Sequence, residues 1–371
     1  MNRIVLIGNG FDLAHGLKTS YKDFINWYWD ERFHNIVTEY NAISSDALCS
    51  MKILPADDFN NWFTFSYFNS FFSNPLTNEW GISGLEFVEK LRKNPGKFEI
   101  VNSPFFEKIC KSIETKGWVD IENEYYSLLT QYATEELSSD NISSLNNQLK
   151  FLTDLLVEYL KSIDNQETVN DGIITKIYSP INARDISVNA SNYDSYDVER
   201  IMLLSFNYTS TAQKYLNNEK RRRRPDGSII QSEFNYIHGR VDDPRSVIFG
   251  YGDELDANFK ELQNSNSDEC LNNVKTIRYL ESDNYKKLLT FMESSPYQVY
   301  IMGHSCGNSD RTLLNTLFEH KNCISIKPYY YIKPDGTDNY LELIKNISRN
   351  FTDMKLMRDR VVNKMYCETL L

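Results

Sequence analysis

Short apolar runs that end abruptly at glycine or polar residues are the feature that most restricts the fold of this chain. The first run is residues 3–7, and further runs span 201–206, 234–239, 246–252, 298–304 and 323–332. Segments with helical spacing lie between several of them, around 256–263, 284–294, 309–319 and 338–349. Continuous apolar strands that alternate with helices are typical of a parallel sheet covered on both faces. The sequence therefore predicts an α/β fold.

A second kind of sequence separates the first strand from the others. From about residue 26 to residue 194 the chain is polar and rich in aromatic residues, with helical periodicity. In LNNQLKFLTDLLVEYLKSI, the leucines Leu145, Leu149, Leu152 and Leu156 form the stripe of an amphipathic helix. We expect one α/β domain made of residues 1–25 plus 195–371, and a helical insertion domain at 26–194.

Composition excludes several classes of protein. With 41% hydrophobic and 13% aromatic residues, the 371-residue chain is globular rather than disordered. Its formal net charge of −11 makes nucleic acid an unlikely partner, because neutralising phosphates requires an excess of basic residues. The basic run KRRRR at 220–224 is typical of a solvated loop, although it could grip phosphate instead.

The spacing of the cysteines and the hydropathy pattern indicate in which cellular compartment we expect the protein. The six cysteines are scattered without a C-x-x-C pair, which predicts neither a disulfide framework nor a metal site. No stretch reaches 18 apolar residues, and the run at 4–7 is too short for the core of a signal peptide. We expect a cytoplasmic protein that makes no use of a membrane.

The candidate site residues lie where apolar runs end, because ligands of open α/β sheets bind at the carboxyl ends of the strands. Gly8 and Gly10 allow a close approach to the main chain, and the helix expected to begin near Asp12 would turn free N–H groups toward an anion. Asn207 could hold a ribose hydroxyl or a water, or could cap the next helix. His238 is a candidate general base or a structural histidine.

The stretch GHSCG at 303–307 also matches the G-x-S-x-G turn that carries the serine nucleophile of α/β-hydrolases. In those enzymes an acid and then a histidine follow the serine, and here the only later histidine is His320. It lies at the end of the helix that Ser305 would begin, too far to reach the hydroxyl. We therefore interpret Ser305 as a hydrogen-bond donor to a nucleotide, and Asp310 as a helix cap or a ribose contact.

Taken together, these motifs resemble the AbiH family of bacterial phage abortive-infection proteins. The resemblance rests on IGNGFDLAHGLKTSYKDF at the start, WVDIENEYY at 118–126, LLSFNYTST at 203–211, IHG at 237–239 and IMGHSCGNSD at 301–310. The order of a glycine turn, an asparagine, a His-Gly pair and a Gly-x-Ser turn also resembles sirtuin-like NAD-binding domains. The resemblance implies a Rossmann-like fold and a role in antiviral defence with a phage-derived trigger. Assembly as a homo-oligomer stays open.

The sirtuin-like resemblance implies a set of roles for these residues. Catalytic roles fall to Asn207, His238 and Asp12. The residues that would bind NAD, as substrate or ligand, are Gly8, Asn9, Gly10, Phe11, Gly239, Gly303, His304, Ser305 and Asp310. Trp118, Asp120 and Glu122, which stand at a predicted helix start, would close the nucleotide pocket from the insertion domain or simply begin the helix.

Two departures from sirtuins affect the expected chemistry. The four-cysteine zinc module is absent, so the resemblance does not imply deacetylation. Thr209 stands where those proteins have an aspartate. The activity that fits is hydrolysis of NAD at the nicotinamide–ribose bond. The alternatives are a nucleotide-binding sensor or scaffold without catalysis, and a nucleic-acid-binding defence protein.

Overall fold

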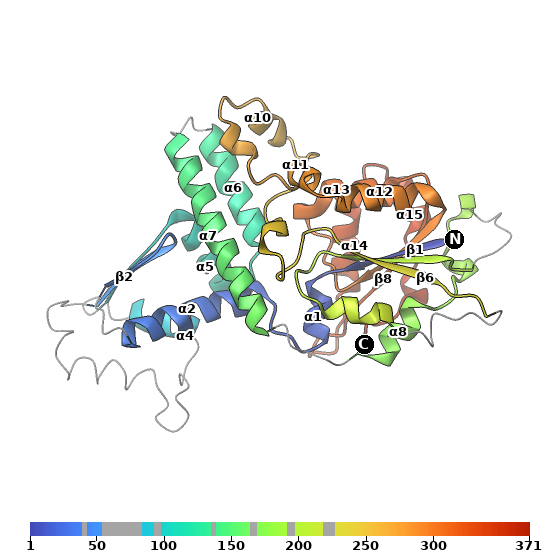
Figure 1. Cartoon of the computed structure of the whole chain (residues 1–371), viewed down its shortest axis with the longest axis horizontal. Helices are drawn as coiled ribbons and strands as arrows, with labels where there is room; N and C mark the ends of the chain where they lie inside the picture. Colours follow the sequence, from blue (N-terminus) through green and yellow to red (C-terminus); the bar gives the residue numbers. More distant parts are fainter. Residues whose placement is uncertain are drawn as a thin grey trace, which may run out of the picture. The chain divides into compact units, whose positions relative to one another are not determined.

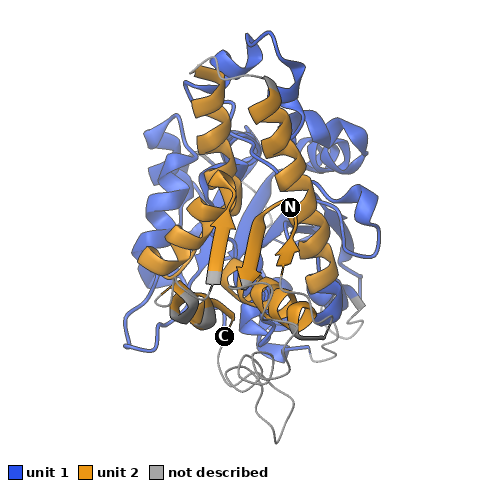
Figure 2. Cartoon of the chain, turned by 90° about the vertical axis from the view of Figure 1, so that its left-hand side faces the viewer, with its two compact units in different colours: residues 1–19, 160–371 blue, residues 20–159 orange. Residues whose placement is uncertain are grey.

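The structure of the protein is a computed structural model. It describes residues 1–38, 43–53, 84–92, 98–134, 139–163, 169–190, 197–217 and 227–371. The chain forms two compact units, shown in different colours in Figure 2. Unit 1 comprises Met1–Thr19 and Leu160–Leu371, and unit 2 comprises Ser20–Tyr159. The basic run at 220–224 lies outside the described residues.

Unit 1 is built on a five-stranded sheet whose pairings are all parallel. The strands are β1 (Asn2–Ile7), β5 (Arg200–Ser205), β6 (Gln231–Tyr236), β7 (Tyr297–Met302) and β8 (Cys323–Tyr329). Their order in the sheet is β6-β5-β1-β7-β8. The expected α/β class and parallel sheet are therefore confirmed. Strands β5 and β6 lie on one side of β1, and strands β7 and β8 lie on its other side. The order of the strands in the sheet therefore reverses next to β1.

Both faces of the sheet are buried, which explains why the strands are apolar at successive positions. Along β1, Ile4 and Leu6 belong to one hydrophobic core, whereas Val5 and Ile7 belong to another. The helices of the first core are α12 (Asn284–Ser294), α13 (Arg311–Glu319), α14 (Tyr340–Arg349) and α15 (Met354–Arg360). On the other face lie α1 (Asn9–Ala14), α8 (Asp171–Ile177) and the 3₁₀ helix η4 (Thr211–Asn217). Figure 1 shows α12, α13 and α15 above the sheet and α1 and α8 below it.

One expected strand is wrong. Residues 246–252 form no strand, although they are apolar, because they pack as a loop against other loops. The amide of Ile248 donates to the carbonyl of His238 at 2.9 Å. At Gly250, an added Cβ would lie 2.0 Å from the carbonyl oxygen of Asn273. The long segment between β6 and β7 also contains α10 (Phe259–Gln263), α11 (Lys275–Arg278) and the 3₁₀ turn η7 (Tyr279–Glu281).

Unit 2 is mainly helical but also contains a sheet that the sequence did not predict. Its helices are α2 (Tyr21–Thr38), α4 (Gly84–Arg92), α5 (Pro104–Lys116), α6 (Ile121–Thr134) and α7 (Ser139–Ile163), whose last turn passes into unit 1. An antiparallel sheet joins β2 (Ile43–Ser45), β3 (Cys49–Ile53) and β4 (Phe98–Asn102). The predicted helix with a leucine stripe is α7, where Leu145, Leu149, Leu152 and Leu156 are all buried.

The boundaries of the units differ from the expected domains at both ends. Ser20 already belongs to unit 2, and unit 1 resumes at Leu160 rather than near residue 195. Helix α8 explains the second difference, because Ile173, Ile174 and Ile177 pack into a core of the parallel sheet. Residues expected in the insertion thus help to cover the sheet.

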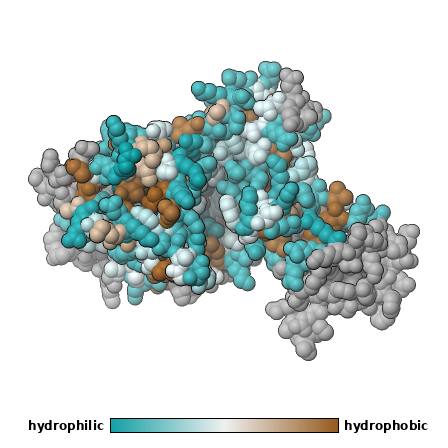
Figure 3. Space-filling model, turned by 180° about the vertical axis from the view of Figure 1, so that it is seen from behind, coloured by the Kyte–Doolittle hydropathy of each residue, from teal (hydrophilic) through white to brown (hydrophobic). Residues whose placement is uncertain are grey.

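The surface is mainly hydrophilic on the face that Figure 3 shows. On the face shown in Figure 3, hydrophilic side chains predominate and apolar ones form scattered groups. Across the described ranges, no helix combines the length and the hydrophobicity that crossing a bilayer requires.

Candidate functional site

The candidate site lies at the carboxyl ends of β1, β5, β6 and β7. The strands β1 and β7 are neighbours, and the order of the sheet reverses beside β1. The turn after β1 leads to α1 on one face of the sheet, and the turn after β7 leads to α13 on the other face. In open α/β sheets this is the place where ligands bind. The residues singled out in the sequence at 8–12, 207, 238 and 303–310 all come from segments that follow these strands.

Glycines allow the turns after β1 and β7 to touch. The amide of Gly10 donates to the carbonyl of Gly303 at 2.8 Å. A Cβ added at Gly8 would lie 2.4 Å from Cα of His304, and one added at Gly303 would lie 2.0 Å from the amide nitrogen of Phe11. Gly303 also has a φ of +77°, which side-chain-bearing residues rarely adopt. These glycines are therefore required by close backbone packing, whatever else they do.

The backbone amides of the first turn bond within the protein. Gly8 donates to the carbonyl of Met302 at 3.3 Å, and Phe11 donates to the carbonyl of Gly8 at 2.8 Å. Helix α1 begins at Asn9, earlier than expected, and has six residues. The side chain of Asn9 is exposed and accepts a hydrogen bond from the hydroxyl of Thr19. In this state the turn does not present the row of open amides that a phosphate cradle would need.

Two polar side chains connect β5 to the first turn. Asn207 is buried, and its Nδ2 donates to the carbonyl of Gly8 at 2.9 Å. The hydroxyl of Thr209 donates to Oδ2 of Asp12 at 2.6 Å, and both residues are buried. The segment after β5 therefore contacts both the turn after β1 and the helix α1, and Asn207 and Asp12 each already have a protein partner.

A buried cluster of titratable groups lies beyond these turns. Asp310 places Oδ1 2.8 Å from Nζ of Lys275 and 3.2 Å from Nε2 of His238. Its Oδ2 lies 3.6 Å from Nε2 of His304. The hydroxyl of Tyr279 lies 3.1 Å from Nε2 of His238. We call Lys275, Asp310, His238 and His304 the His–Asp–Lys cluster.

Aromatic packing and a backbone contact fix the two imidazoles. Phe206 lies edge-on to both rings, with centroids 5.1 Å from that of His238 and 4.2 Å from that of His304. The amide of Cys306 donates to Nδ1 of His304 at 2.9 Å. A neutral His304 therefore carries its proton on Nε2, the nitrogen that faces Asp310.

The surroundings of the cluster lower the pKa values of both His238 and Asp310. Burial, and after it the nearby charge of Lys275, lowers the pKa of His238. Burial by itself would raise the pKa of Asp310, but the Lys275 ammonium and the two histidines hold that pKa well below its usual range. The cluster therefore combines an ionised carboxylate with a neutral imidazole, an arrangement able to accept a proton.

Asp310 precedes α13, but its side chain makes no cap hydrogen bond with that helix. Instead it joins the His–Asp–Lys cluster, so the interpretation of Asp310 as a helix cap is wrong, whereas the ribose contact stays a prediction. Sequence reasoning missed Lys275 and Tyr279, which begin the short helices α11 and η7 in the long segment between β6 and β7. Their i, i+4 spacing, which places both on one side of a helical turn, was the only available signal.

Other candidate residues have local roles in the structure. Gly239 has a φ of +80°, and a Cβ there would lie 2.0 Å from the carbonyl oxygen of Ser246. Ser305 is exposed, and its carbonyl accepts from Nδ2 of Asn346 at 2.9 Å. Within the described ranges, no group of three or more His, Cys, Asp or Glu side chains could hold a metal ion.

The three residues expected to close the pocket belong to unit 2. Trp118 is 60% exposed, whereas Glu122 is buried in α6. Oδ1 of Asp120 accepts from the amide of Asn123 at 3.1 Å, which is the contact of a helix N-cap. The helix predicted for this stretch is present from Ile121.

Comparison with known proteins identifies the family. No curated protein matches the chain. The family model of bacteriophage abortive infection AbiH proteins matches residues 4–331. The match covers most of the chain and includes the turns after β1, β5, β6 and β7 together with the His–Asp–Lys cluster. The chain therefore belongs to the AbiH family of bacteriophage abortive-infection proteins.

Proposed function

We propose that this protein is an abortive-infection effector that hydrolyses NAD at the nicotinamide–ribose bond, and that its sheet is a Rossmann-like, sirtuin-like nucleotide-binding domain. The strand order β6-β5-β1-β7-β8 supports the fold, because doubly wound dinucleotide-binding sheets reverse their order in the same way. One observation carries the activity. A buried imidazole, kept neutral beside an ionised carboxylate, lies at the carboxyl edge where that reversal occurs.

The chemistry needs little beyond positioning and charge. Nicotinamide leaves the ribose as a neutral molecule, water adds its oxygen to C1′, and one proton is released. His238 would take that proton, directly or through a ribose hydroxyl, and Asp310 would stabilise the imidazolium that forms. Asn207 would hold the water or a ribose hydroxyl, and Asp12 would face the positive charge that develops on the sugar.

The tight packing of the site supports a resting form. Gly8, Gly10 and Gly303 are in backbone contact, and Asn207 and Asp12 bond within the protein. The substrate would enter only after the turns following β1 and β7 separate. An effector that consumes the NAD of the host cytoplasm has to stay inactive until infection, and a phage-derived trigger would supply the free energy of opening.

The same packing favours a second candidate, a nucleotide-binding sensor or scaffold without catalysis. The side chain of Asn207 donates to the carbonyl of Gly8, and this bond would compete with its orienting a water for hydrolysis. A sensor of this kind would bind NAD or ADP-ribose at the same edge and release no nicotinamide.

Calorimetric titration with NAD and ADP-ribose, together with assay of nicotinamide release, separates the two candidates. The assay uses protein purified from phage-infected cells, wild type and His238→Gln, with His320→Gln as a control. His320 contacts Glu293 at 3.1 Å and lies outside the His–Asp–Lys cluster. Release that is lost only in His238→Gln supports the effector. Binding without release in all three proteins supports the sensor, and absence of both overturns both candidates.

A further inference from the structure

The turn after β7 contains a residue in an unfavourable backbone conformation. Among the residues that the structure describes, Cys306 alone has a positive φ, +54°, without being a glycine. An L-residue adopts this left-handed conformation at a cost in free energy, and such strain persists only where the surroundings hold it in place. Cys306 is buried. The contacts around this turn therefore have to offset the strain.

Two asparagine side chains at the end of α14 hold the turn. Nδ2 of Asn346 donates to the carbonyl of Ser305 at 2.9 Å. Nδ2 of Asn350 donates to the carbonyl of Cys306, also at 2.9 Å. Asn350 is completely buried, and its own carbonyl accepts from Nδ2 of Asn315 in α13 at 3.0 Å. The turn is therefore tied to two helices on one face of the sheet.

The side chain of Asn350 makes this contact at a cost of its own. Its Nδ2 also donates to the carbonyl of Asn346 at 2.8 Å, so both partners of the amide nitrogen are acceptors and the amide cannot be turned round. Its Oδ1 is left buried without a hydrogen-bond partner, which is unfavourable. The closed turn thus carries two costs, the strain at Cys306 and the unpaired oxygen of Asn350. A displaced turn that admits water would relieve both.

The same turn shapes the candidate site. It begins with Gly303, whose carbonyl accepts from the amide of Gly10 at 2.8 Å. It continues with His304, whose Nδ1 accepts from the amide of Cys306 at 2.9 Å. This second bond leaves Nε2 of His304 facing Asp310, at 3.6 Å from its Oδ2. A change of conformation at Cys306 would therefore alter both the contact between the two turns and the position of His304.

We propose that Asn346 and Asn350 form a latch that holds the turn after β7 against the turn after β1, and that release of this latch opens the candidate site. A turn that a few hydrogen bonds hold against local strain is suited to switching between two states. That the latch regulates activity rests on the proposed function, because it is the substrate that would enter between the separated turns. The latch itself is a property of the fold.

Deuterium exchange of the full-length protein, read by mass spectrometry, tests the latch without any ligand. Peptides that contain Gly10 report on opening, because the amide of Gly10 donates to Gly303 across the two turns. Asn350→Ala should speed this exchange about tenfold, the change expected for loss of one buried hydrogen bond. Asn346→Ala should have a smaller effect, because Asn346 is only half-buried and water can replace its amide.

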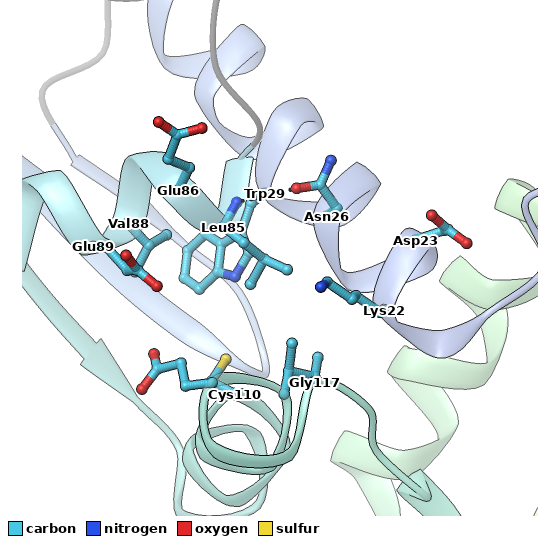
Figure 4. A pocket seen from close by; sticks show the side chains of 12 residues that line it. Lys22, Asp23, Asn26, Trp29, Leu85, Glu86, Val88, Glu89, Cys110 and Gly117 are labelled. Carbon is cyan, nitrogen blue, oxygen red and sulfur yellow. Dashed lines mark hydrogen bonds between the residues drawn. The ribbon is translucent and has the colours of Figure 1, made fainter. Parts of the chain in front are cut away.

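Two controls separate the latch from a general loss of stability. Exchange in residues 201–205 of the central strand β5 should stay as slow as in the wild type. The second control is Val88→Ala, which removes buried methyl groups beside the cavity of unit 2 that Figure 4 shows. Both turns belong to unit 1, so this variant should leave the exchange of Gly10 unchanged.

Substitutions at Cys306 test the strain. Cys306→Gly and Cys306→Ala both remove the thiol, but only glycine adopts the left-handed conformation at little cost. Combined with Asn350→Ala, Cys306→Gly should give exchange at Gly10 about fivefold slower than Cys306→Ala gives. If Asn350→Ala does not fold, Asn346→Ala takes its place in this comparison. The latch is overturned if neither asparagine variant exchanges faster than Val88→Ala, or if glycine and alanine at position 306 give equal rates.

The NAD content of uninfected cells tests the regulatory role. Cells that express Asn346→Ala should lose NAD without a phage, whereas wild-type cells should lose it only after infection. If infected wild-type cells lose NAD and uninfected Asn346→Ala cells do not, the latch does not control the site. If no cells lose NAD, the proposed function fails together with this regulatory role, whereas the exchange measurements still decide whether the latch exists.

Discussion

The ammonium of Lys275 and the imidazole of His238 meet at one carboxylate oxygen, Oδ1 of Asp310, at 2.8 and 3.2 Å. Lys275 is completely buried, and His238 is nearly so. The lysine therefore supplies the positive charge that keeps Asp310 ionised, and its proximity disfavours a second positive charge on the histidine. Burial is the main cause of the lowered pKa of the candidate base, and a lysine outside every sequence motif adds to it.

The first prediction concerns the stability of the Lys275–Asp310 pair. Lys275→Met and Asp310→Asn should each lower the free energy of unfolding by about 3–5 kcal/mol, because each leaves the other partner without its counter-charge in a buried position. The double variant should lose less than the sum of the two. Urea unfolding of the four proteins measures this coupling, and strictly additive losses would contradict an energetic pair.

The second prediction concerns pH. The folded protein disfavours protonation of His238, so below about pH 6.5 the unfolded chain binds a proton that the folded chain does not. Stability should therefore fall as the pH drops from 7.5 to 5.5, by at most about 1.4 kcal/mol per pH unit from this group. Asp310 has a lowered pKa, and the stability it contributes should be lost only below about pH 4.

His238→Gln isolates the contribution of the histidine to this pH dependence. The variant keeps a polar side chain of similar reach but cannot take up a proton. Its melting temperature should change less than that of the wild type between pH 7.5 and 5.5. If the melting temperature of the variant fell with pH as steeply as that of the wild type, His238 would be protonated equally in the folded and the unfolded protein.

The third prediction concerns the glycine of the turn after β7. Gly303→Ala should lower the free energy of unfolding by several kcal/mol, since its Cβ would lie 2.0 Å from the amide nitrogen of Phe11. Gly336→Ala is the matched control, because Gly336 has a similar φ of +82° and no atom within 4 Å of an added Cβ. This control should lose only about 1–2 kcal/mol, the cost of the left-handed backbone. Equal losses would mean that the two turns do not pack in solution.

The sequence predicted the parallel strands well, because each is buried on both faces and so is apolar at successive positions. The same signal was wrong at 246–252, where glycines and loop contacts bury apolar residues without a strand. The small sheet of unit 2 gave little signal, since β2 has 3 residues and β4 lies far from β3 in the chain.

The candidate site was predictable only in part. Gly8, Asn207, His238 and Asp310 follow strands whose carboxyl ends share one edge, so their proximity could be inferred from strand positions. Lys275 could not, because its contact with Asp310 depends on where the long segment between β6 and β7, which contains α11, returns to the sheet. Its complete burial beside a carboxylate is a tertiary property that no local pattern encodes.

The most direct test of the account is the NAD content of phage-infected cells that express the wild-type protein or His238→Gln at equal levels. We expect NAD to collapse after infection in the wild type only, because loss of general base catalysis slows such reactions by about 10²–10⁴-fold. His320→Gln should behave as the wild type. Unchanged NAD in protected wild-type cells, or an equal collapse with His238→Gln, would contradict hydrolysis of NAD at this site.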